Sequence, residues 1–152
     1  MRLKLREAVT DKILRLFGFL VDEFGCRVIS ERRDGQPEQV TFANQTTFVR
    51  VAVERKLEVL VHFGPFRNNT IPPYGAGWYD LNSLLIARNE PVPQCVARGF
   101  RPGELDRCLA EHAEALRRVG GDVLQGDFSV LPLLDETIRD RLRAQHEPGE
   151  GR

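Results

Sequence analysis

The chain begins with an apolar stripe at helical spacing. Within residues 4–24 the stripe consists of Val9, Ile13, Leu16, Phe17, Leu20, Val21 and Phe24. Gly25 follows and marks an end, because glycine adopts the left-handed conformation at little cost. Gly18 inside the segment costs about 1 kcal/mol relative to alanine and would allow close packing on a sheet. The pattern predicts an N-terminal helix over residues 4–24.

Two alternating segments follow and predict a first hairpin. Residues 27–33 and 39–43 have strand character, and they flank the sequence Asp34-Gly35-Gln36-Pro37. An Asp-Gly pair between such segments is a strong turn signal. The pattern allows both a two-residue connection and longer ones.

A second pair of strands shows a stricter alternation. One face carries Val49, Val51 and Val53, and the matching face of the next segment carries Leu57, Val59, Val61 and Phe63. A two-residue loop at 55–56 would place Val53 opposite Glu58, whereas a three-residue loop at 54–56 places Val53 opposite Leu57. We therefore predict the three-residue loop, with the N-terminal helix covering the apolar face. The opposite face is expected to be largely solvated and carries Arg50, Glu54, Glu58 and His62.

The segment 64–78, GPFRNNTIPPYGAGW, is a long loop for a compact domain. Loops of this length are usually functional or mobile. It contains Phe66, Ile71, Tyr74 and Trp78. These side chains either fold back as a plug on the sheet edge or form an exposed contact surface, and the sequence leaves both alternatives open.

The second half of the chain is predicted to be helical. Asp80 is a candidate N-cap for a short helix ending at Arg88. A longer helix is expected over residues 103–119, ended by the glycines that follow. A last helix carries Leu131, Leu134, Ile138 and Leu142.

These elements predict an α+β fold. An N-terminal helix packs on a four-stranded antiparallel sheet, followed by a short helix and two C-terminal helices. Residues 1–145 are expected to form a single domain, and residues 146–152 a disordered tail.

Composition narrows the function classes. The 22 basic and 22 acidic side chains give a net charge of zero, which argues against general nucleic-acid or anionic-membrane binding but leaves room for a local patch. Cys26, Cys95 and Cys108 are widely spaced and are expected to be reduced thiols. With no apolar run of signal-peptide or membrane-span length, a cytoplasmic location is expected.

The histidines are the candidates for acid–base chemistry. His62 with Glu58, and with Tyr74 or Asp80 nearby, could serve a small hydrolase. His112 lies in the apolar stripe of its helix and is expected to be structural. The sequence shows no metal-binding spacing of histidines, no phosphate-binding loop and no dinucleotide motif, so neither a metal nor a cofactor is predicted.

Two stretches resemble a known group of small bacterial proteins. They are LFGFLVDEFGCRVISE with the following TTFVRVAVERKLEVLVHFGP, and LAEHAEALRRVGGDVLQGDFSVLPLL. The combination is similar to proteins grouped with the immunity proteins of polymorphic toxin systems. The resemblance implies a compact α+β fold and a role in binding and neutralising a toxin. It supplies no functional residues.

The sequence therefore favours a non-catalytic protein-binding module, with an immunity or antitoxin-like inhibitor as its most concrete form. The predicted contact residues are Phe66, Arg67, Tyr74 and Trp78 of the loop, with His62 beside them. The main alternative is an intracellular adaptor or homo-oligomeric scaffold that uses the last two helices. A hydrolase built on His62 is the third hypothesis, and the oligomeric state is left open.

Overall fold

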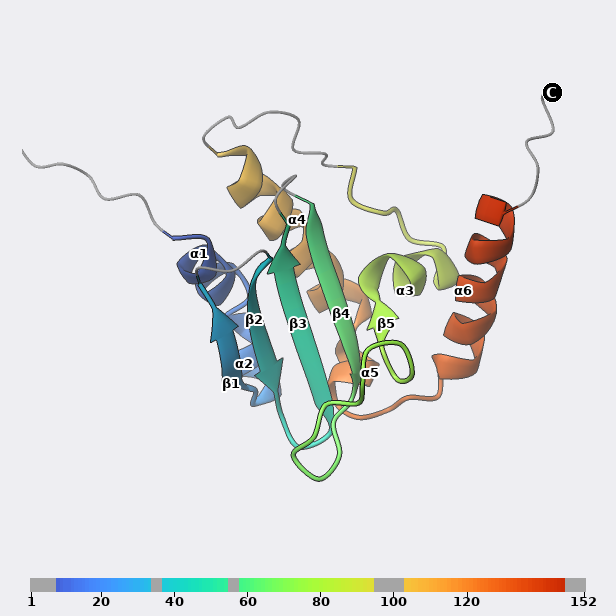
Figure 1. The fold of residues 1–152 in the computed structure, drawn as a ribbon, viewed down its shortest axis with the longest axis horizontal. Coiled ribbons are helices and arrows are strands. Elements are labelled where there is room, and N and C mark those ends of the chain that lie inside the picture. The colour runs from blue at the N-terminus through green and yellow to red at the C-terminus, as the bar shows by residue number, and fades with distance from the viewer. Residues whose placement is uncertain (1–7, 34–36, 55–57, 95–102, 147–152) are drawn as a thin grey trace, which may run out of the picture.

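The computed structural model describes residues 8–33, 37–54, 58–94 and 103–146 of the chain (Figure 1). Its strands form one antiparallel sheet in the order β1-β2-β3-β4-β5. They are β1 (Arg27–Arg32), β2 (Glu38–Ala43), β3 (Thr47–Val53), β4 (Val59–Pro65) and β5 (Tyr79–Asp80). The helices are α1 (Val9–Leu16), α2 (Phe19–Phe24), α3 (Leu81–Ala87), α4 (Glu104–Val119), α5 (Gly121–Leu124) and α6 (Leu131–His146). The α+β class is confirmed, and the two-residue strand β5 adds to the four strands that the sequence predicts.

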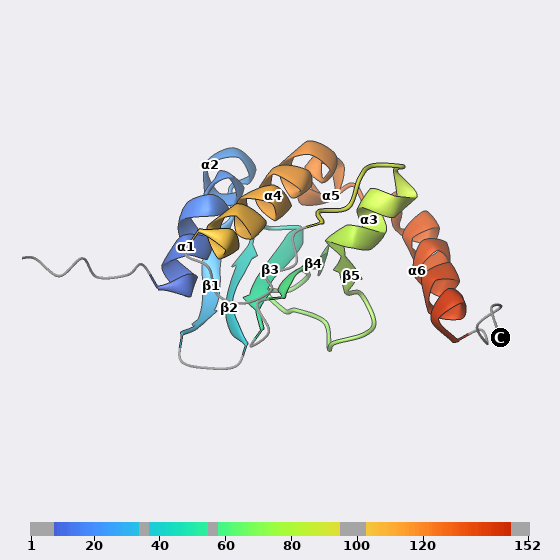
Figure 2. The ribbon, with the colours of Figure 1, turned by 90° about the horizontal axis from the view of Figure 1, so that it is seen from above.

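Helices cover one face of the sheet. Figure 2 shows α1, α2, α4 and α5 on one side of the strands, whereas the loop between β4 and β5 lies on the other side. The alternating valines of β3 and β4 meet the helices in one hydrophobic core, which includes Ile13, Leu20, Val49, Val51, Val61, Phe63, Leu109 and Leu116. The prediction that the N-terminal helical segment covers this face is therefore confirmed, and α4 covers it as well. We call the other side the open face.

The N-terminal helix is interrupted, contrary to the single helix predicted over 4–24. α1 ends at Leu16 and α2 begins at Phe19, with Gly18 between them. The backbone N–H of Leu20 donates to the carbonyl of Phe17, a three-residue turn that breaks the α-helical pattern. The stripe assumes one helix axis, and beyond the break Leu20 is still buried whereas Val21 is exposed. Residues 1–7, where the predicted helix began, lie outside the described residues.

The register of β3 and β4 differs from the predicted one by two residues. Val53 pairs with Val59 and Val51 with Val61, whereas the prediction paired Val53 with Leu57, a residue outside the described part. The backbone N–H of Glu54 donates to the carbonyl of Glu58 and extends the ladder. A shift of two residues leaves every side chain on its own face, so alternation alone could not distinguish the two registers.

The C-terminal half follows the sequence more closely. α4 begins one residue after the predicted start and ends at Val119, as predicted. α6 is longer than the predicted apolar set and extends to His146, which the sequence assigned to a disordered tail. Residues 147–152 of that tail lie outside the described part of the chain. Leu134 is the fully buried side chain of α6, whereas Leu133 and Leu142 are 45% and 49% exposed.

Candidate functional site

A row of polar side chains crosses the open face on all five strands. Strand pairing places its members side by side, and they are Ser30, Thr41, Arg50, His62 and Asp80. Adjacent strands lie about 4.8 Å apart, so this polar row spans roughly 19 Å. It brings a cation, an imidazole and a carboxylate onto neighbouring strands.

The loop that follows β4 folds back over one end of the open face. Its side chains Phe66, Ile71 and Trp78 pack with Ala43 and Phe48 in a second, smaller hydrophobic cluster. The Trp78 indole lies 4.8 Å from the Phe48 ring centroid, and its Nε1–H donates to the carbonyl of Pro72 at 2.7 Å. The face was expected to be largely solvated, but at the end that carries Phe48 the loop covers the sheet and buries it.

Four rings form an aromatic cluster where the loop meets the polar row. The cluster consists of Phe48, His62, Tyr74 and Trp78. Trp78 lies 5.2 Å from Tyr74 and 5.7 Å from His62 between ring centroids, and His62 lies 5.9 Å from Tyr74. These separations and tilted geometries are those of favourable aromatic contacts. Tyr74 is nevertheless 78% exposed, so it projects from the cluster into solvent.

Arg50 joins the polar row to the aromatic cluster. Its guanidinium lies 4.8 Å from the Trp78 ring centroid, a cation–π contact, and its Nε donates to the Thr41 hydroxyl at 3.0 Å. Partial burial lowers the pKa of Arg50, because burial disfavours the charged form. No described carboxylate forms an ion pair with this guanidinium.

His62 lies between Arg50 and Asp80 in the polar row. Burial lowers the pKa of this imidazole, the Asp80 carboxylate partly offsets that effect, and the Arg50 charge adds to the lowering. His62 is therefore neutral at pH 7, and its ring makes no side-chain hydrogen bond with the described residues. A neutral ring of this kind can donate or accept one hydrogen bond from a partner.

Asp80 connects the sheet to α3 and α6. Its carboxylate accepts the backbone N–H of Ser83 at 2.9 Å and so caps α3, as the sequence predicts. It also accepts the Ser83 hydroxyl at 2.7 Å and Arg141 of α6 at 3.0 Å. Burial alone raises the pKa of Asp80, but these hydrogen bonds and the Arg141 charge outweigh it and lower the pKa overall.

Replacing Asp80 by alanine is expected to destabilise the fold. The Asp80→Ala variant loses a helix cap and leaves Arg141 without this partner, so we expect a decrease of about 2 kcal/mol in the free energy of unfolding. Asp140→Ala removes an exposed carboxylate of α6 whose ion pair within the described part of the chain is with Arg143, at 3.8 Å, and should change stability by less than about 0.5 kcal/mol. Urea denaturation followed by circular dichroism measures both, and equal stabilities would contradict the assigned role of Asp80.

The predicted contact residues divide into supporting and exposed groups. Phe66 is 4% exposed and packs inward, so it supports the loop from beneath, and its contact with a partner stays a prediction. Trp78 is partly buried, whereas Arg67 and Tyr74 are exposed. The loop therefore has features of both alternatives that the sequence left open, because Phe66 and Trp78 pack on the sheet while Arg67 and Tyr74 are exposed.

The sequence did not single out Arg50 or Thr41. The alternation of apolar and polar residues placed Arg50 on the same face as His62. Charged residues on such a face are ordinarily solvated, so the pattern did not distinguish Arg50 from other surface charges. The signal that could have found Arg50 is its place directly across from His62, which follows only from the observed register.

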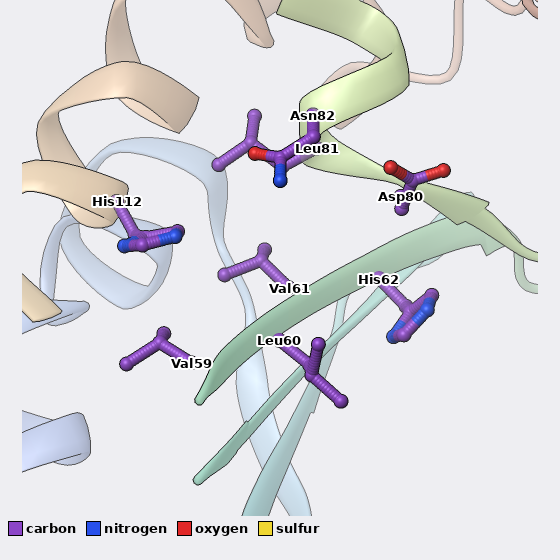
Figure 3. Close-up of a pocket in the computed structure, with 8 residues that line it drawn as sticks. All are labelled: Val59, Leu60, Val61, His62, Asp80, Leu81, Asn82 and His112. Carbon is purple, nitrogen blue, oxygen red and sulfur yellow. The ribbon is translucent and has the colours of Figure 1, made fainter. Parts of the chain in front are cut away.

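A small cavity lies beside the polar row, next to the part of β4 that β5 does not pair. It has a volume of about 50 Å³ and is lined by Val59, Leu60, Val61, His62, Asp80, Leu81, Asn82 and His112. Figure 3 shows His62 and Leu60 on the opposite side of β4 from Val61. This volume has room for one or two water molecules at about 30 Å³ each and is far below the roughly 300 Å³ of a typical ligand pocket. The pair of His62 with Glu58 that the sequence allows is not formed, and Asp80, the other carboxylate that the sequence named, lies beside the imidazole.

His112 is the structural histidine that the sequence predicts. It is buried in α4, and its Nδ1–H donates to the carbonyl of Cys108 at 2.7 Å. Burial lowers the pKa of His112, and the Cys108 carbonyl and the Glu111 charge partly offset this.

The stability of the fold is expected to fall as the pH is lowered from about 7.5 to about 5.5. The folded-state pKa values of His62 and His112 lie below their usual 6.5, so the unfolded chain binds more protons in this range and gains stability relative to the fold. Asp80 and Asp122 have lowered pKa values and act in the same direction only near pH 4 and below. Urea denaturation at both pH values tests this, and the His112→Gln variant should show a smaller decrease. A stability that stays constant or rises on acidification would contradict the assignment.

Other candidate sites receive no structural support. Among the residues that the structure describes, no three His, Cys, Asp or Glu side chains gather as metal ligands, and no described helix has the length and apolar character of a membrane span. Cys26 and Cys108 are buried free thiols, and burial raises the pKa of Cys26 to about 11; Cys95 lies outside the described residues. Comparisons with protein-family models, with curated proteins and with solved structures gave no match.

Proposed function

We propose that the chain is a protein-binding module whose contact surface is the open face at the aromatic cluster. The observation that carries the proposal is Tyr74, a large aromatic side chain that is 78% exposed yet lies against Trp78 and His62. Tyrosine, tryptophan and arginine are the residue types that most often dominate binding energy at protein interfaces. Here all three types meet at one place.

The surface is prepared for binding by its own internal contacts. Trp78 is fixed by its hydrogen bond to Pro72 and by the Phe48 ring beneath it. Arg50 is fixed between Thr41 and Trp78. Side chains that are already ordered lose less conformational entropy when a partner binds, which supports a contact surface at this position.

The most concrete form of this function is a cytoplasmic immunity protein that binds and neutralises a bacterial toxin. Its support is the sequence resemblance described above, together with a surface suited to protein contact. Inhibition by binding needs no reactive group of the inhibitor, and the 50 Å³ cavity beside His62 is too small to support the alternative of a hydrolase.

The experiment is affinity capture from the organism that encodes the chain, followed by a growth assay. The captured protein is expressed alone and together with the chain. Arrested growth that the wild-type chain relieves and the Tyr74→Ala variant does not relieve supports the proposal. Capture that is unaffected by Tyr74→Ala contradicts the proposed surface, and a captured protein without effect on growth contradicts the immunity role.

A homo-oligomeric scaffold is the second candidate, favoured by the exposed leucines of α6. Leu133 and Leu142 are about half exposed on a helix whose one fully buried side chain is Leu134. Contact between copies through α6 would cover them. Light scattering of the wild-type chain and of Leu142→Asp decides the matter: an oligomer that the substitution dissociates supports this candidate, and a monomer at high concentration contradicts it.

A further inference from the structure

The open face carries more positive than negative charge, although the whole chain is neutral. Strand pairing places Arg27 beside Ala43 and Arg32 beside Gln39, and therefore on the same face as Arg50. The loop above this face adds the exposed Arg67. None of these four arginines forms an ion pair with a described residue.

The carboxylates on this side do not neutralise that charge. Asp80 is held by Arg141 and Ser83 at the β5 end of the polar row. Glu54, just beyond the end of β3, and Glu58, just before β4, are exposed on this face and form no ion pair with a described residue. Glu31 alternates to the helix side, where its carboxylate accepts a hydrogen bond from Arg33, which also contacts Asp11 of α1. With Arg27, Arg32, Arg50 and Arg67 against the exposed Glu54 and Glu58, the open face keeps an excess of positive charge.

Arg50 is the member of this surface best placed to bind an anion. Its Nε is used by Thr41, whereas its two Nη groups have no acceptor among the described residues. A guanidinium that is partly buried and held on an aromatic face gives a stronger interaction with a carboxylate than a free surface cation does. The neighbouring His62 is neutral and does not compete for the anion.

We propose that the partner of the open face is an acidic protein segment whose carboxylates bind Arg50 and the unpaired arginines of β1, while Tyr74 and Trp78 make the apolar contact. This proposal rests on the protein-binding function proposed above and specifies the chemistry of the partner. The planar guanidinium suits a carboxylate, which it can bind with two parallel hydrogen bonds. Steering by the surrounding arginines should make the binding sensitive to salt.

The probe is a capped ten-residue oligoglutamate, with oligoglutamine of equal length as the neutral control. Trp78 is the chain's one tryptophan and lies in contact with Arg50, so its fluorescence reports binding at the site. We expect a saturable change at peptide concentrations below about 1 mM, weakened by added salt and absent with oligoglutamine.

Three variants locate the binding. Arg50→Gln should weaken oligoglutamate binding about tenfold, the loss expected for a hydrogen bond between charged groups. The double variant Arg27→Gln and Arg32→Gln changes only exposed side chains and should also weaken binding, which keeps the test valid if Arg50→Gln folds poorly. Arg143→Gln makes the same charge change on the exposed side of α6 and should leave binding unchanged.

The outcomes separate this inference from the proposed function. No saturable oligoglutamate binding, or equal losses in Arg143→Gln and the open-face variants, overturns the acidic partner. If oligoglutamate does not bind but Tyr74→Ala still abolishes capture of the natural partner, the protein-binding function stands and the acidic nature of the partner does not. Tighter binding of a ten-nucleotide oligouridylate, lost in Arg50→Gln, would overturn both proposals, because the face would then recognise nucleic acid.

Discussion

Replacing Gly64 by alanine is expected to lower the free energy of unfolding by about 3 kcal/mol, at the upper end of what overpacking costs. Gly64 lies on the open face of β4, opposite Phe48. A Cβ atom at this position would lie 1.9 Å from the carbonyl oxygen of Gly77 and 2.9 Å from Cε1 of Phe48. Because one of these contacts is with backbone, the loop must move away from the sheet.

Movement of the loop should be visible at Trp78, which directly follows Gly77. Urea denaturation by circular dichroism gives the stability of Gly64→Ala, and tryptophan emission shows whether the indole has lost its packing on Phe48. Gly121→Ala is the matched control, because a Cβ there meets no atom within 4 Å, and it should change stability by no more than about 1 kcal/mol. A Gly64→Ala variant with the stability and emission of the wild type would contradict the close contact between Gly64 and the backbone of Gly77.

The second large effect is expected on binding. Truncating Tyr74 in the Tyr74→Ala variant should weaken binding of the captured partner by about 2 kcal/mol, or roughly 30-fold, as for the dominant residues of other interfaces. The fold itself should change by less than about 0.5 kcal/mol, because Tyr74 is 78% exposed. Affinity is measured by titration calorimetry, and stability by urea denaturation.

Leu142→Ala provides the control for this comparison. Leu142 is also a large exposed side chain, 49% accessible, but it lies on α6. Its truncation should leave the affinity for the partner unchanged if the open face is the contact surface. A larger loss in Leu142→Ala than in Tyr74→Ala would instead place the interface on α6.

The elements of the fold could be predicted because their signals are local. The alternation of Val49, Val51 and Val53 assigned the faces of β3, and Asp80 was recognised as the cap of α3. Register depends on the length of a connection, and a shift of two residues preserves every face. The pairing of Val53 with Val59 was therefore not determined by the pattern.

The site was predicted in part for a similar reason. Tyr74 and Trp78 could be found because aromatic residues are conspicuous in a loop rich in glycine and proline. Arg50 could not be found in this way, because its place in the site depends on contacts with Thr41 and Trp78 that form only in the tertiary structure. The close approach of Gly77 to Gly64 likewise joins residues 13 positions apart and leaves no local pattern.

Amide hydrogen exchange of the chain, alone and bound to its captured partner, tests the proposed contact surface most directly. If the open face binds the partner through the aromatic cluster, exchange should slow in residues 66–78, which follow β4, and stay unchanged in α6. Slower exchange in α6 with no change in residues 66–78 would contradict the account. The partner would then bind α6 and not the surface formed by Arg50, Tyr74 and Trp78.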